Sequence, residues 1–237
     1  MSIVQSGCLS TLRRTVTPMA EKYYVLMIDI IGSAKVPDRA ALSRTLDSAI
    51  SRINAEYPHD YWAPFEVTKG DEVAGVLVSM ARVYDMIDTL SQALYPVMFR
   101  CVLVFDQLDA GVDTRRSTVI DGPAFHRADQ LMRRLKKTQK TFALSSGEEE
   151  LDAATEALVN FLLWRWNNLT ELQRRIVRVY QQERNQSRVA DILQRKQQQV
   201  QHTLDVCKWQ LIDGAEKAVR GLFEIIDRRT RTGGLDG

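Results

Sequence analysis

The first part of the chain alternates short apolar runs with stretches of helical spacing. Residues 23–31 form an apolar run that is interrupted only by Asp29 and ends at Gly32-Ser33, which predicts a buried central strand. Residues 38–57 place apolar side chains three and four positions apart. This spacing predicts a helix, with Asp38 as its N-cap and Pro58 just beyond its end.

The same periodicities extend to residue 145. Lys69-Gly70-Asp71 predicts a tight hairpin turn between two strands. In chain order we expect strands at 65–68 and 72–79, a helix at 81–94, a strand at 97–106, a short strand or loop at 111–120, a helix at 124–137 and a strand at 141–144. This order predicts an α+β sandwich of the ferredoxin-like type.

Beyond residue 150 the chain becomes helical in character. Residues 151–226 contain no proline and only two glycines, so helix is expected throughout. We therefore predict a mobile N-terminal arm over residues 1–20, an α+β domain over residues 21–145 and an all-α domain over residues 151–230.

Composition narrows the class of protein. Of the 237 residues, 45% are hydrophobic and 26% are charged, as in ordinary globular proteins. No apolar run approaches the roughly 18 residues that span a bilayer, and no apolar core follows Arg13-Arg14, so we expect no membrane partner and no secretion signal. Cys8, Cys101 and Cys207 are too far apart for a disulfide framework or a zinc site, which favours a reducing cytoplasm.

Charge is unevenly distributed along the chain. The net charge is +2, but residues 160–237 carry 14 Lys and Arg against 9 Asp and Glu. This modest positive excess is compatible with an acidic partner of the all-α domain and also with ordinary solubility.

Two acidic residues interrupt the apolar segments of the α+β domain. Asp29 lies within the first predicted strand, and Asp71 lies at the tip of the predicted hairpin. An ionised carboxylate is costly to bury unless it is paired or bound to a metal ion. Because the strand and the hairpin are neighbours in the predicted sheet, the two carboxylates are expected to lie close together and to bind Mg²⁺ or Mn²⁺.

Each carboxylate also has a simpler interpretation. Asp29 could cap the following helix or pair with a lysine, and Asp71 could serve only the turn. The site interpretation gains from Gly32 and Ser33, because backbone amides at such a strand end can cradle phosphate oxygens.

These segments resemble the catalytic domains of class III nucleotidyl cyclases and, more distantly, of GGDEF diguanylate cyclases. Ile28-Asp29-Ile30-Ile31-Gly32 matches the strand motif, and Lys69-Gly70-Asp71-Glu72-Val73-Ala74 matches the hairpin motif. The resemblance implies a homodimer that binds a nucleoside triphosphate or a related nucleotide. It assigns metal binding to Asp29, Ile30 and Asp71, and nucleotide or phosphate binding to Ile31, Gly32, Ser33 and Gly70.

A third segment, residues 121–131, looks like the cyclase turn and helix that carry an asparagine and an arginine. Those positions fall here on His126 and Gln130, and the purine-reading lysine falls on Val67. The departures favour binding over cyclisation. His126 and Arg127 are the candidate catalytic replacements, since the planar fork of Arg127 suits a phosphate; the arginine could equally pair with Glu72 or Asp121.

Together the three segments are similar to the SatD family of bacterial proteins, over about residues 23–226. The string Asp-Gly-Pro-Ala-Phe-His-Arg-Ala at residues 121–128 is the most diagnostic. This resemblance implies the fold more than it implies an activity.

The all-α domain contains a pattern typical of a helix-turn-helix. Ala190 is small enough for two helices to cross, and Val200 follows ten residues later on the next helix. Leu169-Thr170-Glu171-Leu172-Gln173 resembles the opening of sigma-factor-like DNA-reading modules, with Thr170 as the N-cap. Candidate contacts to double-stranded DNA are Arg195, Lys196, Gln198, Gln201 and His202.

The same helices suit dimerisation or a scaffold role, and Trp164, Trp166 and Trp209 are expected to be core or interface anchors. The sequence therefore favours a bacterial regulator that joins a nucleotide- and metal-binding cyclase-like sensor to a DNA-binding or dimerising helical part. The alternative is an active metal-dependent nucleotidyl cyclase or transferase that makes a signalling nucleotide.

Overall fold

The computed structural model describes residues 21–232, with the side chain of Lys69 excepted, and contains one mixed sheet and eight helices in that range. The predicted arm at residues 1–20 lies outside the described residues. The α+β part consists of β1 (Lys22–Ile30), α1 (Arg39–Glu56), β2 (Tyr61–Lys69), β3 (Glu72–Leu77), α2 (Val83–Leu94), β4 (Phe99–Gln107), α3 (Pro123–Leu135) and β5 (Phe142–Ser145). The predicted order of strands and helices is confirmed, as is Asp38 as the N-cap of α1.

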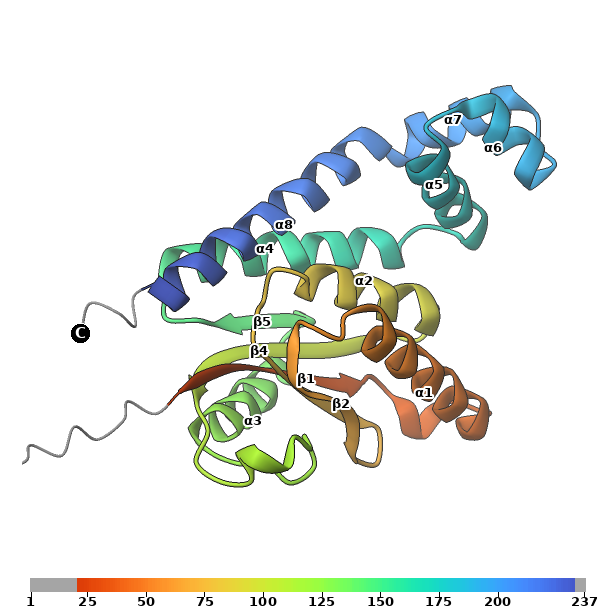
Figure 1. Ribbon diagram of the computed structural model, residues 1–237. Helices are drawn as coiled ribbons and strands as arrows, with labels where there is room; N and C mark the ends of the chain where they lie inside the picture. Colours follow the sequence, from red (N-terminus) through yellow and green to blue (C-terminus); the bar gives the residue numbers. More distant parts are fainter. Residues whose placement is uncertain (1–20, 233–237) are drawn as a thin grey trace, which may run out of the picture.

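The sheet has the strand order β2-β3-β1-β4-β5, with β1 at its centre (Figure 1). β1 pairs antiparallel with both β3 and β4, and β5 adds to β4 in parallel. The C-terminal end of β1 therefore lies beside the start of β3 and the start of β4, where Asp29 has Glu72 and Arg100 as its register partners.

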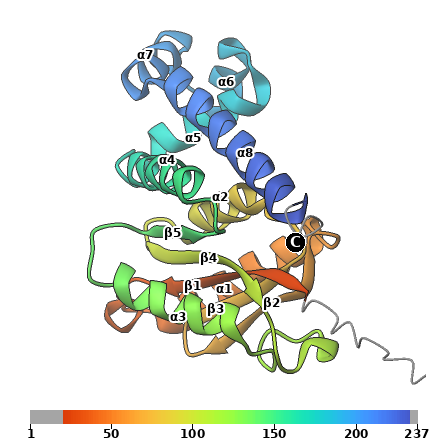
Figure 2. The ribbon, with the colours of Figure 1, turned by 90° about the vertical axis from the view of Figure 1, so that its left-hand side faces the viewer.

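Alternate residues of β1 enter two separate cores. Leu26 and Ile28 pack in the core on the face covered by α1 and α2, whereas Val25 and Met27 pack with α3 on the other face (Figure 2). Because side chains alternate along a strand, Asp29 belongs to the α3 face.

The remaining helices are α4 (Glu149–Asn167), α5 (Glu171–Glu183), α6 (Gln186–Leu193), α7 (Gln197–Cys207) and α8 (Trp209–Thr232). α4 packs on β5 and against α8, and the two long helices, which run in roughly opposite directions, lie close together near the end of α8 and diverge toward α5 (Figure 1). α5, α6 and α7 pack on one another at the far end of this pair, and we call them the three-helix unit.

The end of α8 returns to the sheet. Asp227 accepts hydrogen bonds from the Ser79 hydroxyl at 3.0 Å and from the Met80 N–H at 2.9 Å, and the Tyr24 and Thr230 hydroxyls are hydrogen-bonded. One hydrophobic core accordingly extends from β1 to Ile226, across the position where the sequence predicts a domain boundary.

Of the two possibilities predicted for residues 111–120, the structure shows the loop, with a short 3₁₀ helix, Val112–Thr114, and an isolated bridge between Ala110 and Asp121. Beyond residue 150, where helical character is predicted throughout, left-handed residues at Arg184, Gln194 and Lys208 separate the helices. These residues end α5, α6 and α7 without the glycine that usually marks such a stop. The break at Gln194 lies between Ala190 and Val200, where the helix-turn-helix pattern predicts a turn.

None of the described helices is both long enough and apolar enough to cross a membrane.

Candidate functional site

Asp29 is neutralised by two cations at the end of β1. It is only 8% exposed, and its Oδ1 lies 2.7 Å from the Lys136 Nζ, just past the end of α3. Its Oδ2 lies 3.5 Å from Nη1 of Arg100, which is on β4. The sequence interpretation of a buried aspartate paired with a lysine is therefore the arrangement that the structure shows.

Lys136 bridges two carboxylates. Its Nζ is also 3.5 Å from Oε1 of Glu72, the register neighbour of Asp29. Partial burial works against the charge of this lysine, but the hydrogen bond and attraction from Asp29, assisted by Glu72, raise the pKa of Lys136 above its ordinary value. The lysine is thus firmly cationic and links α3 to both central strands.

Asp71 lies in a different environment. With Gly70 it forms the two-residue turn between β2 and β3, as predicted, and both residues line a pocket of about 420 Å³ against the start of α1. We call this the hairpin pocket. Its walls also include Ile30, Ser33 and Arg39.

The predicted phosphate-binding residues are split between two places. Ser33 and Gly70 meet in the hairpin pocket, whereas Ile31 lines a second pocket beside α4. The Ile31 N–H already donates to the Met98 carbonyl at 2.8 Å, so it has no free amide for a phosphate. Gly32 adopts a left-handed conformation, φ 69°, at the turn between β1 and the 3₁₀ helix Ser33–Lys35.

Whether a divalent cation fits between Asp29 and Asp71 depends on where the two carboxylates point and on their charged neighbours. Asp29 faces the cations of α3 and β4, while Asp71 faces α1, so the two carboxylates do not converge on one point. Across residues 21–232 no cluster of three or more His, Cys, Asp or Glu side chains is arranged to hold a metal ion. This conformation does not fit a two-carboxylate metal centre, and Mg²⁺ or Mn²⁺ binding stays a prediction.

His126 and Arg127 lie on the exposed side of α3. His126 Nε2 is 3.5 Å from Oδ1 of Asp121, and Arg127 Nη1 is 3.3 Å from Oδ2 of Asp106. The arginine thus has a carboxylate partner other than the two considered from the sequence. Both residues are on the face of the sheet opposite the hairpin pocket, so one chain does not bring them to that pocket.

The candidate DNA contacts are gathered on one surface. Arg195, Lys196, Gln198, Gln201 and His202 are all exposed. Val200 and Leu204 on the opposite side of α7 are buried, as predicted, and so is Ala190 of α6. The left-handed Gln194 turns the chain between α6 and α7 at the position where such motifs often have glycine.

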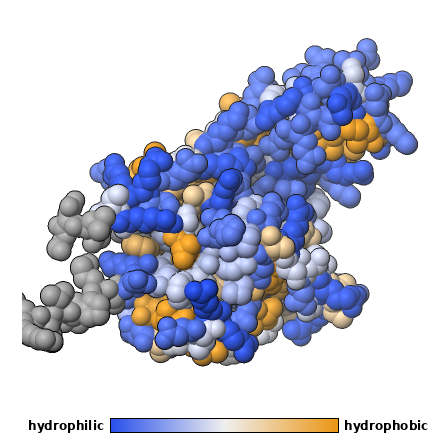
Figure 3. Space-filling model, viewed as in Figure 1, coloured by the Kyte–Doolittle hydropathy of each residue, from blue (hydrophilic) through white to orange (hydrophobic). Residues whose placement is uncertain are grey.

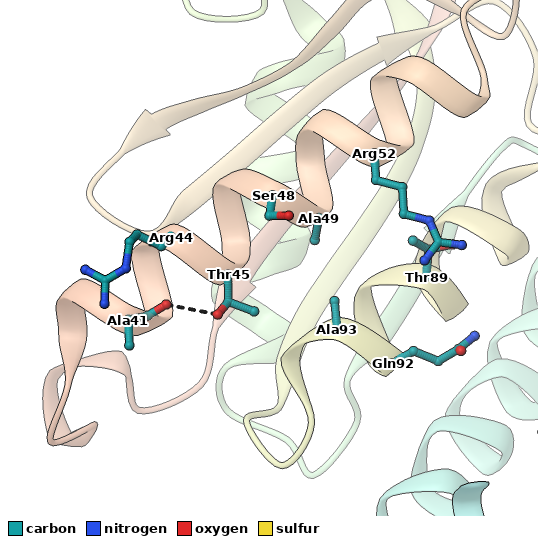
Figure 4. Close-up of a pocket in the computed structure, with 9 residues that line it drawn as sticks. All are labelled: Ala41, Arg44, Thr45, Ser48, Ala49, Arg52, Thr89, Gln92 and Ala93. Atoms are coloured by element: carbon teal, nitrogen blue, oxygen red, sulfur yellow. Dashed lines mark hydrogen bonds between the residues drawn. The ribbon is translucent and has the colours of Figure 1, made fainter.

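A further pocket, of about 550 Å³, lies in the groove between α1 and α2 (Figure 4). Small side chains such as Ala49 and Ala93 form its floor, and Arg44 and Arg52 flank it. It contains none of the site residues expected from the sequence, and the hydrogen bond drawn there joins Thr45 to the Ala41 carbonyl within α1 at 2.9 Å.

Comparison with protein-family models shows to which family the chain belongs. The model of the SatD family matches residues 23–219. The chain belongs to the SatD family. No curated protein sequence matches this SatD-family chain.

The matches of the SatD-family chain to solved structures are weak. Two structures of a bacterial light-regulated adenylyl cyclase are 19% and 18% identical, with TM-scores of 0.42 and 0.41. Each alignment covers 57% of this chain, and they cover 81% and 46% of the cyclase chains. A regulator of polyketide synthase expression from Bifidobacterium adolescentis is 14% identical with a TM-score of 0.27, covering 89% of this chain and 82% of that one.

Several residues of the site in this SatD-family protein were not identified from the sequence. Lys136, Arg100 and Arg39 contact or line it from three separate elements. The signal for Lys136 was the buried Asp29 itself, which requires a cation, but nothing in the sequence says which of the 32 Lys and Arg residues supplies it.

Proposed function

We propose that this SatD-family protein is a regulator whose α+β part binds a nucleotide and whose three-helix unit binds double-stranded DNA. The observation that supports DNA binding is the surface at the start of α7, where two basic and three polar side chains are exposed together. Their helix is held from behind by buried Val200 and Leu204, which pack on the other helices of the unit.

The chemistry of this surface matches a duplex. Arg195 and Lys196 precede the first turn of α7 and can neutralise phosphates, while Gln198 and Gln201 can hydrogen-bond to adenine edges in the major groove. α6 and α7 would then act as a helix-turn-helix, with α7 as the recognition helix.

Nucleotide binding is supported by the end of the sheet. The hairpin pocket, with Ser33, Gly70 and Arg39, lies beside the C-terminal end of β1. An arginine and a hydroxyl beside a left-handed glycine are suitable groups for a phosphate. The protein would sense the nucleotide and report it through α4 and α8 to the three-helix unit.

Dimerisation through the three-helix unit and the start of α8 is the second candidate role, and exposed apolar side chains favour it. Ile192, Val206 and Leu211 lie on α6, α7 and α8 and are each at least half exposed. Hydrophobic surface is visible on this part of the molecule among hydrophilic surroundings (Figure 3). A dimer would present two copies of α7, as helix-turn-helix readers commonly do.

Fluorescence anisotropy of a labelled duplex, measured over a salt series, tests DNA binding. The double variant Arg195→Ala/Lys196→Ala is expected to bind more weakly at all sequences and to reduce the salt slope by about 1 for each phosphate that is no longer neutralised. The matched control Arg44→Ala/Arg52→Ala removes two exposed arginines from α1. Equal weakening in both variants, or no duplex binding by the wild type, would overturn the proposal.

The enzymatic alternative is tested in the same preparation. Incubation with ATP or GTP and Mg²⁺ or Mn²⁺, followed by chromatographic analysis of the nucleotides, is expected to return the substrate unchanged. A cyclic or linear product that disappears in Asp71→Asn would instead make the protein a nucleotidyl cyclase or transferase.

A further inference from the structure

A second pocket lies at the same end of the sheet, on the side away from the hairpin. Its volume is about 680 Å³, within the range of small-molecule sites. It is formed by the residues at the ends of β1 and β4, by the loop 138–141 before β5, and by the C-terminal half of α4. We call it the α4 pocket.

Trp164 forms an aromatic wall of the α4 pocket. Its side chain is exposed, with the residue at 58% of its full accessibility, although Leu163 and Trp166 on the same helix are buried. Met98, also exposed, lines the pocket with it. A large exposed indole beside a cavity is a suitable platform for stacking a planar heteroaromatic ring.

Arg100 provides positive charge at the same pocket. It shares Asp29 with Lys136, and its contact with that carboxylate is the longer one, 3.5 Å against 2.7 Å. Among the described residues its buried Nε has no hydrogen-bond partner. Lys140 is a second cation of the pocket, 3.4 Å from Glu156 and largely exposed. Arg100 and Lys140 together suit an anionic group such as a phosphate.

The amides of the pocket divide into structural and available groups. Asn160 is fully used, because its Oδ1 accepts from the Thr141 and Phe142 N–H groups and its Nδ2 donates to the Phe142 carbonyl. Asn167, at the end of α4, lines the pocket and offers both a donor and an acceptor, the pair of groups that can read the edge of a base.

We infer that the α4 pocket binds a nucleoside phosphate, with the base stacked on Trp164 and the phosphate directed toward Arg100 and Lys140. This inference rests on the proposed nucleotide binding and places the ligand in the α4 pocket rather than in the hairpin pocket. The base is held by α4, the helix that connects the sheet to the three-helix unit, so the ligand contacts the end of the sheet and the helix that leads to that unit.

Calorimetric titration with ATP and with GTP tests the assignment. Trp164→Leu is expected to weaken binding of the preferred nucleotide about tenfold, since the variant has no aromatic side chain on which the base can stack. Phe161→Leu is the matched control, because Phe161 is an exposed aromatic residue on the same helix, 6.0 Å from Trp164 between ring centroids, but does not line the pocket. It should bind within twofold of the wild type.

A third variant separates the two pockets. Ser33→Ala alters the hairpin pocket only and should leave the affinity within twofold if the α4 pocket holds the ligand. Wild-type binding that Ser33→Ala weakens and Trp164→Leu does not would overturn this inference and leave the proposed function intact. Absence of binding by the wild type would overturn both. The side chains of Ser33 and Trp164 are at least partly accessible, and a thermal melt confirms that each variant is folded.

Discussion

Asp29 and Asp71 have the same chemical group but different physical tasks. Asp29 is buried and held by Lys136 and Arg100, whereas Asp71 is half-buried in a turn and forms no ion pair with a described residue. The sequence allowed both a paired and a metal-bound Asp29, because an acidic residue in an apolar strand requires a positive partner of some kind. Its partner is 107 residues away, and this distance in sequence concealed it.

Exchanging each aspartate for asparagine separates these tasks. We expect Asp29→Asn to lower the free energy of unfolding by about 1–3 kcal/mol, because Lys136 and Arg100 lose the carboxylate that neutralises them. Asp71→Asn should change it by less than about 0.5 kcal/mol, as asparagine also suits a turn. Urea denaturation followed by circular dichroism measures both, and equal stability of the two variants would contradict the ion-pair assignment.

At the scale of elements, a buried polar cluster joins α2, α4, α5 and α8. Glu216 of α8 accepts hydrogen bonds from the Trp166 Nε1 at 3.0 Å, the Tyr84 hydroxyl at 3.2 Å and the Gln181 Nε2 at 2.9 Å. Arg178 of α5 pairs with Asp88 of α2 and lies 3.6 Å from Glu216. Each of the four helices therefore supplies a hydrogen-bonding or charged partner for a polar side chain of another helix.

Glu216 should make stability depend on pH in a definite direction. Burial and, next, repulsion from Asp88 raise the pKa of Glu216 above its ordinary 4.5, against the opposing attraction of Arg178. Between 4.5 and the raised value the folded protein binds more protons than the unfolded chain, so stability increases as pH falls. The wild type should therefore gain stability relative to Glu216→Gln when the pH is lowered from about 8 to about 5.

The measurement is urea unfolding of the two proteins across that pH range. Glu224→Gln, which changes an exposed glutamate of the same helix, should follow the wild type at every pH. If the difference in the free energy of unfolding between wild type and Glu216→Gln stayed constant across this pH range, the raised pKa of Glu216 would be contradicted.

Prediction of the elements succeeded where a local pattern was sufficient. The apolar run of β1, the Gly70-Asp71 turn and the N-cap at Thr170 are all readable from neighbouring residues. The break between α6 and α7 was predicted from the helix-turn-helix pattern, but the left-handed conformations of Arg184, Gln194 and Lys208 were not, because they are maintained by the packing of the helices that these residues connect. Trp164 was expected in a core or an interface, and the structure excludes the core.

At the scale of the whole molecule, α4 and α8 unite what the sequence treats as two domains. Their inner sides belong to the core over the sheet, and their far ends carry the three-helix unit (Figure 1). A change at the end of β1 can therefore reach α5–α7 through two packed helices rather than through a flexible linker. This continuity depends on contacts between distant residues, which hydrophobic periodicity does not reveal.

The three-helix unit and the adjoining start of α8 are also where we expect two chains to meet. Leu211 is 70% exposed, and Val206 and Ile192 add apolar surface on neighbouring helices. Exposed apolar side chains on neighbouring helices are typical of an interface, and a two-fold dimer would pair this part of the surface with itself. Light scattering should give twice the chain mass of 27.0 kDa for the wild type and a single chain mass for Leu211→Glu. Val119→Glu, at an exposed apolar position of the α+β part, should remain dimeric, and a monomeric wild type would refute the expectation.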